Sequence, residues 1–248
     1  MNKKGFVYDR TQPSVFKNLD VGWYYTWGLQ GSVGVDRPFT PMIWGAPDAH
    51  KLSQIPAGST EILAFNEPDG NQAGAQSNIS IKNVVSLWPL LKATGLRIGS
   101  VAAAQNPLAT SYTPSDGSPP LTTSYFDALW SELTAAGMQP DFIALHWYAP
   151  PDSQGFLSWL DSIYAKYKKP LWITEMCVAD WKATTSERFT TAQIQAFMDS
   201  VVAGMNSRPY VERFTWKTRP TTDVNMGNGA LVALDGTLTS LGQHYASL

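Results

Sequence analysis

The sequence has few of the residues on which several common kinds of site depend. Only one of its 248 residues, Cys177, is a cysteine, so no intrachain disulfide can form. Histidine occurs three times, and His50 and His244 have no ligand-like neighbours in the sequence, which argues against a histidine metal site. The sequence contains no signature of a Ser or Cys nucleophile and no glycine-rich phosphate loop. We therefore expect a protein without a metal or cofactor.

Charge and long apolar runs are also scarce. Charged residues make up 15% of the chain and the net charge is −2 at pH 7, so we expect no attraction to nucleic acid or to an anionic membrane surface. No apolar run approaches transmembrane length. Met1–Lys4 resembles the start of a signal peptide, but Gly5–Arg10 is too short and polar to be its apolar core. The expectation is either the mature form of an exported (secreted or periplasmic) protein or a cytoplasmic one.

Aromatic residues, in contrast, are abundant. The chain has 10 Trp, 10 Tyr and 10 Phe, and this number of Trp exceeds what an ordinary core requires. Sugar rings have apolar C–H faces that lie well on flat aromatic side chains, so some of the indoles are expected to contact a carbohydrate. For any single Trp, packing inside the protein is an equally good interpretation.

The pattern of apolar residues predicts one α/β domain over residues 1–248, because no flexible linker or charge run divides the chain. Strand-like and helix-like segments alternate, which is typical of a parallel sheet. The predicted helices are Ile81–Thr94, Ser124–Ala136, Gln154–Tyr167 and Thr191–Asn206. The predicted strands are Val21–Trp27, Phe39–Trp44, Ile62–Asn66, Arg97–Ala102, Phe142–Trp147, Leu171–Thr174, Arg213–Lys217 and Leu231–Leu234.

Eight strands in a chain of this length suit a compact, closed (β/α)8 (TIM) barrel with short helices. Two long polar segments, Gln105–Thr123 and Thr218–Gly229, each follow a predicted strand. We expect them to be loops at the catalytic face of the barrel.

Two of the predicted strands lead into a glutamate, Glu67 after Asn66 and Glu175 after Thr174. Barrel enzymes carry their chemistry at the C-terminal ends of the strands, and two carboxylates in one cleft can cleave a glycosidic bond. A gap of roughly 5 Å between them would allow direct attack on the sugar, and roughly 6.5–9.5 Å would leave room for a water. The alternative for each glutamate is an ordinary exposed loop residue.

A third strand end, Leu145–Tyr148, contributes further polar groups. His146 and Tyr148 share one side of the strand and Trp147 lies on the other. Tyr148 is a candidate donor to Glu175, and His146 a candidate to bind a hydroxyl or tune Glu67. A buried histidine without a catalytic role is the alternative.

Five segments stand in the chain in this order: Tyr24–Gly28, Pro41–Gly45, Phe65–Asp69, Ala144–Tyr148 and Trp172–Glu175. Together they resemble glycoside hydrolase family 128, a family of β-1,3-glucanases within a larger clan of retaining barrel glycosidases. The resemblance implies retaining hydrolysis, with Glu67 as acid/base and Glu175 as nucleophile.

The same resemblance implies the residues that bind the sugar. Asn66 would contact the hydroxyl next to the reacting carbon, Tyr148 would hydrogen-bond the nucleophile, and Trp216 would form the floor of the reacting subsite. Trp27, Trp44 and Trp147 are candidates for stacking on glucan, whereas Trp181 and Trp23 suit packing equally well.

Strand numbering differs from the pattern of the wider clan. There the carboxylates follow the fourth and seventh strands, whereas our count places Glu67 and Glu175 after the third and sixth. The offset of three is the same, which predicts a further strand near the N-terminus, at about Gly5–Tyr8. Cys177 also stands in an unusual place for the family, two residues after Glu175, and has no assigned role.

The leading hypothesis is thus a monomeric endo-β-1,3-glucanase that acts on β-1,3-glucan such as laminarin. One alternative is the same mechanism on mannan or xylan. The other is a barrel that binds β-glucan without cleaving it.

Overall fold

A computed structural model describes residues 2–7 and 13–248, which fall into two compact units. Unit 1 consists of Met1–Tyr24, Ser32–Pro38 and Trp147–Leu248, apart from the residues outside that description, and unit 2 consists of Tyr25–Gly31 and Phe39–His146. The chain passes from one unit to the other at four places, and two of these lie within strands, in β2 (Trp23–Tyr25) and in β5 (Ile143–Ala149).

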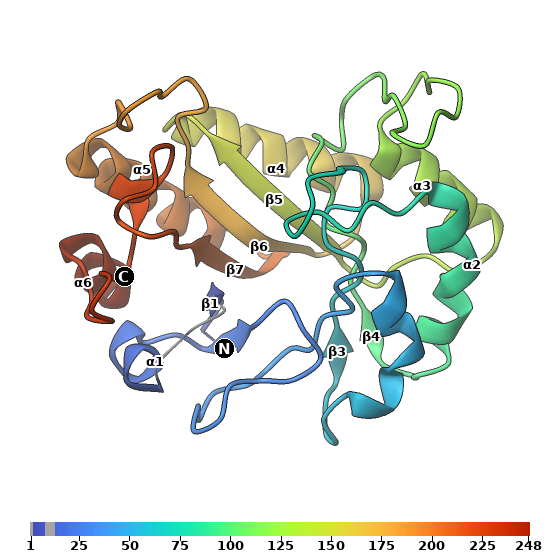
Figure 1. Cartoon of the computed structure of the whole chain (residues 1–248), viewed down its shortest axis with the longest axis horizontal. Helices are drawn as coiled ribbons and strands as arrows, with labels where there is room; N and C mark the ends of the chain where they lie inside the picture. Colours follow the sequence, from blue (N-terminus) through green and yellow to red (C-terminus); the bar gives the residue numbers. More distant parts are fainter. Residues whose placement is uncertain (1, 8–12) are drawn as a thin grey trace. The chain divides into compact units, whose positions relative to one another are not determined.

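Unit 1 is built on parallel strands. The sheet order is β2-β1-β7-β6-β5, in which β1 (Lys4–Val7) and β6 (Leu171–Val178) flank β7 (Val211–Lys217). Both β1 and β6 pair in parallel with β7, and β6 and β7 run side by side in Figure 1. Every residue of β1 and β6 is buried, as expected for parallel strands covered on both faces.

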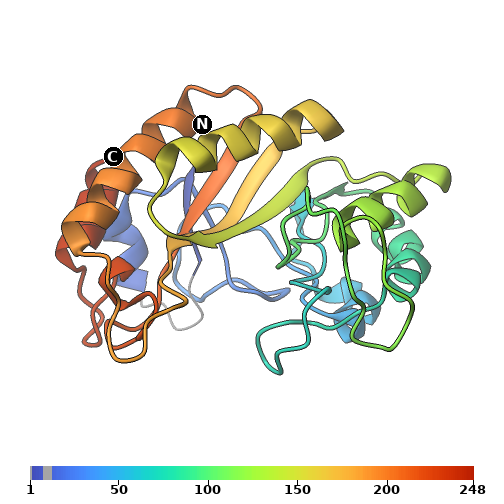
Figure 2. The same ribbon diagram turned by 90° about the horizontal axis from the view of Figure 1, so that it is seen from above.

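Two long helices cover the strands of unit 1. α4 (Ser153–Tyr167) and α5 (Thr191–Asn206) pack against each other and lie over the same face of β6 and β7 (Figure 2). Thr190 and Gln193 form a reciprocal capping box at the start of α5. Its buried residues recur at helical spacing: Ile194, Phe197, Met198, Val201, Val202 and Met205. α1 (Pro13–Leu19) and α6 (Ser240–Ser247) pack against each other.

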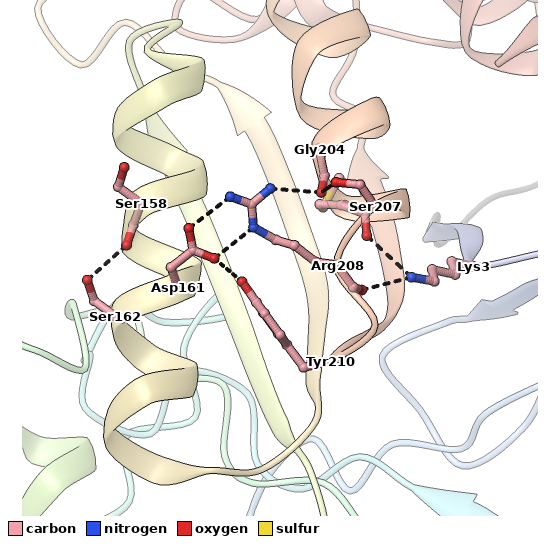
Figure 3. A network of polar contacts seen from close by, with 9 residues as sticks. Lys3, Ser158, Asp161, Ser162, Gly204, Ser207, Arg208 and Tyr210 are labelled. Carbon is pink, nitrogen blue, oxygen red and sulfur yellow. Dashed lines mark hydrogen bonds and ion pairs between the residues drawn. The ribbon is translucent and has the colours of Figure 1, made fainter.

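Polar contacts link these helices to neighbouring parts of the chain. The Arg208 guanidinium donates to both carboxylate oxygens of Asp161 on α4, each at 2.8 Å, and Tyr210 donates to the same carboxylate (Figure 3). Lys3 donates to the carbonyl of Arg208 at 3.0 Å. Lys4 donates to the carbonyls of Tyr245 and Ala246 in α6, at 2.7 and 3.1 Å.

Unit 2 has shorter parallel pairing. β3 (Glu61–Ile62) pairs with β4 (Arg97–Ile98), and single parallel bridges continue the pairing at Met42 with Leu63, Asn66 with Ala102, and Gly99 with Phe142. The segments 41–44, 61–66, 97–102 and the residues leading into β5 are therefore neighbours in chain order. α2 (Ile81–Lys92) packs against α3 (Tyr125–Ala135) and against the 3-10 turn η1 (Ala46–His50), which η2 (Leu52–Gln54) follows.

The strands of unit 2 are shorter than predicted for physical reasons. Pro41 lies within the predicted strand Phe39–Trp44 and has no N–H for the ladder, so that segment forms an isolated bridge. In the next pair, Ala144 donates its N–H to the Ser100 hydroxyl at 3.0 Å rather than to a backbone carbonyl. The Ser100 hydroxyl thus takes the place of a backbone carbonyl as the acceptor between these two segments.

Most predicted elements are confirmed, but two predicted strands, Phe39–Trp44 and Leu231–Leu234, are not among the strands of the described residues. All four predicted helices are present, with bounds that differ by two residues at most. The strand expected near the N-terminus is β1, although Tyr8 lies outside the described residues. In the described chain, Leu231–Leu234 is not a strand of the parallel sheet. Its Val232 forms an antiparallel bridge with Leu238, because a turn at Gly236, with φ of 84°, folds the chain back.

The fold is therefore α/β, with parallel sheet and six α-helices in the described residues. None of the helices in residues 2–7 and 13–248 is both long and apolar enough to cross a membrane.

Candidate active site

Glu67 follows the 61–66 segment of unit 2 in a strained backbone conformation. Its φ is 42°, in the left-handed region that residues other than glycine seldom adopt. Its N–H donates to the Ala102 carbonyl at 2.7 Å, so the neighbouring segment holds the strained residue in place. Strain of this kind concentrates at functional sites.

Both carboxylate oxygens of Glu67 have a partner within unit 2. Oε1 lies 2.9 Å from Nδ1 of His146, and Oε2 accepts a hydrogen bond of 3.1 Å from Nε2 of Gln76. The side chain of Glu67 is 14% exposed and that of His146 is 2% exposed. The structure thus brings His146 to Glu67, as the strand alternation predicts, and leaves part of the glutamate accessible.

Asn66 is buried beside Glu67. Its N–H donates to the Trp44 carbonyl at 3.0 Å, and its Nδ2 donates to the Ala75 carbonyl at 2.9 Å. Its Oδ1 is buried and has no hydrogen-bond partner among the described residues. A buried acceptor in this state can accept a hydrogen bond from a ligand hydroxyl.

Asp69 anchors the long loop that starts at Gln105. Its carboxylate accepts hydrogen bonds from the backbone N–H groups of Ala104 and Gln105, at 2.8 and 2.7 Å. Burial raises the pKa of Asp69 above its usual value, against the opposing effect of these two bonds. Sequence reasoning assigned Asp69 no role, although it belongs to the Asn-Glu-Pro-Asp motif.

Glu175 lies on β6 of unit 1 and is buried. The Tyr148 hydroxyl donates a hydrogen bond to its Oε2. The structure therefore contains the contact between Tyr148 and Glu175 that the sequence predicts. A neutral phenol that donates to a carboxylate favours its ionised form.

Trp181 presents an exposed ring next to Tyr148. Its indole N–H donates to the Tyr148 carbonyl at 3.0 Å, and the two rings meet nearly edge to face, with centroids 6.3 Å apart at 74°. The residue is 60% exposed. Sequence reasoning left Trp181 undecided between packing and binding, because neither its exposure nor its contact with Tyr148 has a sequence signal.

The other tryptophans predicted to bind glucan divide into two groups. Trp147 stacks on Phe197 of α5, with ring centroids 5.0 Å apart, and Trp216 is fully buried with its N–H donating to the Gly229 carbonyl at 2.8 Å. Both rings are thus used in packing, and sugar contacts by them stay a prediction. Trp27 and Trp44 are half-buried in unit 2.

Polar contacts join the loops that follow β6 and β7. Asn225 donates to the Asp180 carbonyl at 2.8 Å, and the Asn228 N–H donates to Glu187 at 2.9 Å. The Arg188 guanidinium holds the pKa of Asp180 well below its usual range. Burial raises the pKa of Glu187 to about 7, against the opposing effect of its bond to Asn228, and Oε1 of Glu187 has no hydrogen-bond partner among the described residues.

Two further observations concern metals and the cysteine. Within residues 2–7 and 13–248, no group of three or more His, Cys, Asp or Glu residues could hold a metal ion. Cys177 is fully buried, and burial raises the pKa of its thiol.

Comparisons with known proteins identify one family. The model of the glycosyl hydrolase catalytic core matches residues 5–245. A subgroup I endo-β-1,3-glucanase of glycoside hydrolase family 128 from Amycolatopsis mediterranei, solved with laminaritriose, is 30% identical. That match covers 100% of this chain and 99% of the other, with a TM-score of 0.81. None of the curated proteins compared with the chain matches it.

Two further solved structures are similar over nearly the whole chain. A subgroup II endo-β-1,3-glucanase of the same family from Sorangium cellulosum is 25% identical, with 99% and 98% of the two chains covered and a TM-score of 0.77. A subgroup VII oligosaccharide-binding protein from Trichoderma gamsii shares the fold at 21% identity, with 99% and 93% covered and a TM-score of 0.73.

Proposed function

This chain belongs to glycoside hydrolase family 128, and we propose that it is a retaining endo-β-1,3-glucanase. The observation that carries the proposal is the match, over the full length of both chains, to the Amycolatopsis enzyme solved with laminaritriose. The proposed substrate is a β-1,3-glucan polysaccharide or oligosaccharide, and the proposed active form is a monomer.

We propose further that residues 1–248 form a single closed (β/α)8 barrel. Eight strand-like segments support this: β1, β2, 41–44, 61–66, 97–102, β5, β6 and β7. On this count Glu67 follows the fourth segment and Glu175 lies on the seventh. That numbering agrees with the wider clan, because β1 supplies the strand missing from the sequence-based count.

The proposed reaction has two steps. In the first, Glu175 attacks the anomeric carbon while Glu67 gives its proton to the departing glycosidic oxygen, so that a glycosyl-enzyme forms as the C–O bond breaks. In the second, Glu67 takes a proton from water, whose oxygen attacks the same carbon and releases Glu175. The Tyr148 hydroxyl supports the role of Glu175, because its hydrogen bond favours an ionised nucleophile.

Several side chains support sugar binding near these glutamates. The buried Oδ1 of Asn66 is an acceptor for the hydroxyl next to the reacting carbon. The half-buried rings of Trp27 and Trp44, and the exposed ring of Trp181, are candidates for stacking on sugar faces.

A glucan-binding protein without catalytic activity is the main alternative. The likeness to the Trichoderma oligosaccharide-binding protein shows that this fold is compatible with such a role. Binding alone does not require that Glu67 be held by His146 and Gln76, and Glu175 by Tyr148. These contacts therefore favour an enzyme. The same mechanism acting on mannan or xylan is the other alternative.

The test is the release of reducing sugar from laminarin, mannan and xylan by the wild-type chain, two active-site variants and one control variant. Glu175→Gln and Glu67→Gln should each lose at least roughly 10³-fold in kcat on laminarin. Glu132→Gln, on the exposed face of α3, is the matched control and should keep wild-type activity. Wild-type turnover by Glu175→Gln would contradict the proposed roles, and binding of laminarin without product would favour the binding protein.

A further inference from the structure

The loop that follows Glu67 folds back onto the strand end that carries it. Ala75 accepts from the Asn66 side chain at 2.9 Å, and the Ser77 N–H donates to the Asn66 carbonyl at 3.0 Å. The Ile79 N–H donates to the Pro68 carbonyl at 2.9 Å. Gln76 lies between Ala75 and Ser77, so these backbone contacts fix the place from which its side chain reaches Glu67.

A backbone group fixes which way the Gln76 amide faces. Its Oε1 accepts a hydrogen bond of 2.9 Å from the N–H of Gln72. Because a backbone N–H can only donate, the amide oxygen must lie on that side and the NH2 group must face Glu67. The contact of 3.1 Å with Oε2 is therefore a donation from Gln76.

Gly70 leaves the space in which this amide lies. A Cβ atom at position 70 would be 2.1 Å from Cδ and from Oε1 of Gln76, which is closer than atoms without a bond can approach. The Gly70 N–H in turn donates to the Glu67 carbonyl at 3.2 Å. The absence of a side chain at Gly70 thus leaves room for the side chain of Gln76, and the backbone at Gly70 has no unusual φ.

We propose that Gln76 is a positioning residue for Glu67 that also assists the loss of its proton, an inference that rests on the proposed function. With His146 on Oε1 and Gln76 on Oε2, the plane of the carboxyl group is fixed at two points. When the proton moves from Glu67 to the glycosidic oxygen, negative charge develops on the carboxylate. The hydrogen bond from Gln76 strengthens with that charge and so stabilises the transition state more than the ground state.

The electrostatic surroundings of Glu67 within unit 2 are compatible with this role. The titratable groups that act on it there are His146 on β5 and Asp69 in the turn that follows it. The carboxylate of Asp69 accepts hydrogen bonds from two backbone N–H groups, and neighbouring carboxylates such as those of Asp69 and Glu67 repel each other when both are charged. Gln76 supplies a donor without adding charge to this group.

The test compares two substrates that differ in their need for an acid. Laminarin has a poor leaving group that needs a proton, whereas 2,4-dinitrophenyl β-laminaribioside has one that does not. Gln76→Met keeps the length of the side chain and removes the donor. We expect roughly tenfold lower kcat/KM on laminarin and less than about twofold change on the dinitrophenyl substrate, because kcat/KM reports the step that includes leaving-group departure.

A series of aryl β-laminaribiosides gives a second readout that a purely structural role would not change. The loss of kcat/KM in Gln76→Met should grow as the leaving phenol becomes more basic, because a poorer leaving group depends more on proton transfer from Glu67. Gln72→Ala is the matched control, since it removes an exposed side chain from the same loop and keeps the backbone N–H that binds Gln76.

Gly70→Ala tests the inference without altering either polar group. It should displace the Gln76 amide and reproduce both effects, and the double variant with Gln76→Met should show no further loss. Equal losses on laminarin and the dinitrophenyl substrate, or the same loss across the aryl series with normal thermal unfolding, would overturn the inference. A wild-type chain that cleaves neither substrate would overturn the proposed function itself, and the inference with it.

Discussion

Glu67 and Glu175 receive different partners from the fold, and the difference suits the two proposed roles. Glu67 is held by an imidazole and an amide and keeps some exposed surface, as a group that must exchange a proton with substrate and water requires. Glu175 is buried and accepts from a phenol, an arrangement that favours a carboxylate ready to attack.

At this scale, sequence patterns predicted some contacts and missed others. Strand alternation placed His146 and Tyr148 on the same side of β5, and the structure brings them to Glu67 and Glu175. Gln76 lies in a polar loop without periodicity, and its importance depends on contacts that fold the loop back. Such contacts have no sequence signal, so Gln76 could not be predicted.

Trp181 gives the residue-scale prediction. If its exposed ring forms a sugar subsite, Trp181→Ala should raise KM for laminari-oligosaccharides roughly three- to tenfold with a smaller effect on kcat, because stacking contributes about 0.5–1.5 kcal/mol. Steady-state kinetics on laminaripentaose measures both constants. Trp181→Phe, which keeps an aromatic face but loses the N–H, should have a KM between those of the wild type and Trp181→Ala. An unchanged KM in Trp181→Ala would assign the ring to packing alone.

At the scale of elements, helices were predicted better than strands. The apolar spacing and the capping signal of Thr190 and Gln193 are local, and the bounds of α5 match the prediction. Strand pairing depends on the neighbour. Pro41 interrupts one ladder, the Ser100 side chain replaces a rung in another, and the turn at Gly236 folds Leu231–Leu234 into a local bridge.

The contact between Lys4 and α6 leads to a prediction about stability. Lys4 is buried and donates to two carbonyls at the C-terminal end of α6, where the helix dipole favours a positive charge. Lys4→Met should lower the free energy of unfolding by roughly 2–3 kcal/mol, as measured by urea denaturation. Lys17→Met, at an exposed position of α1, is the control and should change it by less than about 0.5 kcal/mol. Equal stability of the two variants would contradict this role.

The loops after β6 and β7 give a pH-dependent prediction. The pKa of Glu187 is raised to about 7, whereas an unfolded chain has the ordinary, lower value. Between those values the folded state binds the proton more tightly, so stability falls as pH rises from about 4.5 to about 7 and stays level above. Glu187→Gln should therefore be the more stable protein at pH 8, by roughly 1–3 kcal/mol, and should show little difference at pH 4.

Thermal or urea unfolding of the wild type and Glu187→Gln at several pH values measures this difference. The amide of Gln can still accept the hydrogen bond from the Asn228 N–H, so that contact is retained. A stability difference that is the same at pH 4 and pH 8 would show that Glu187 does not titrate in this range.

For the whole molecule, the predicted family and the α/β class are confirmed. The offset of three strands between Glu67 and Glu175 indicated a strand that the direct count did not include, and β1 is that strand. The sequence-based count missed β1 because Lys4–Val7 is short and begins with a charged residue. Lys4 is nevertheless buried there, since its charge is bound by carbonyls of α6 that are over 240 residues away in the chain. A tertiary contact of that kind overrides the local pattern.

The central claim is that this chain cleaves β-1,3-glucan with retention of configuration, with Glu67 and Glu175 as its two carboxylates. The most direct test is proton NMR of laminarin during the first minutes of hydrolysis, before the new reducing ends interconvert. The account predicts that the β-anomer appears first, that the products form a mixed ladder of oligosaccharides, and that Glu175→Gln gives neither. The α-anomer as the first product would contradict the account.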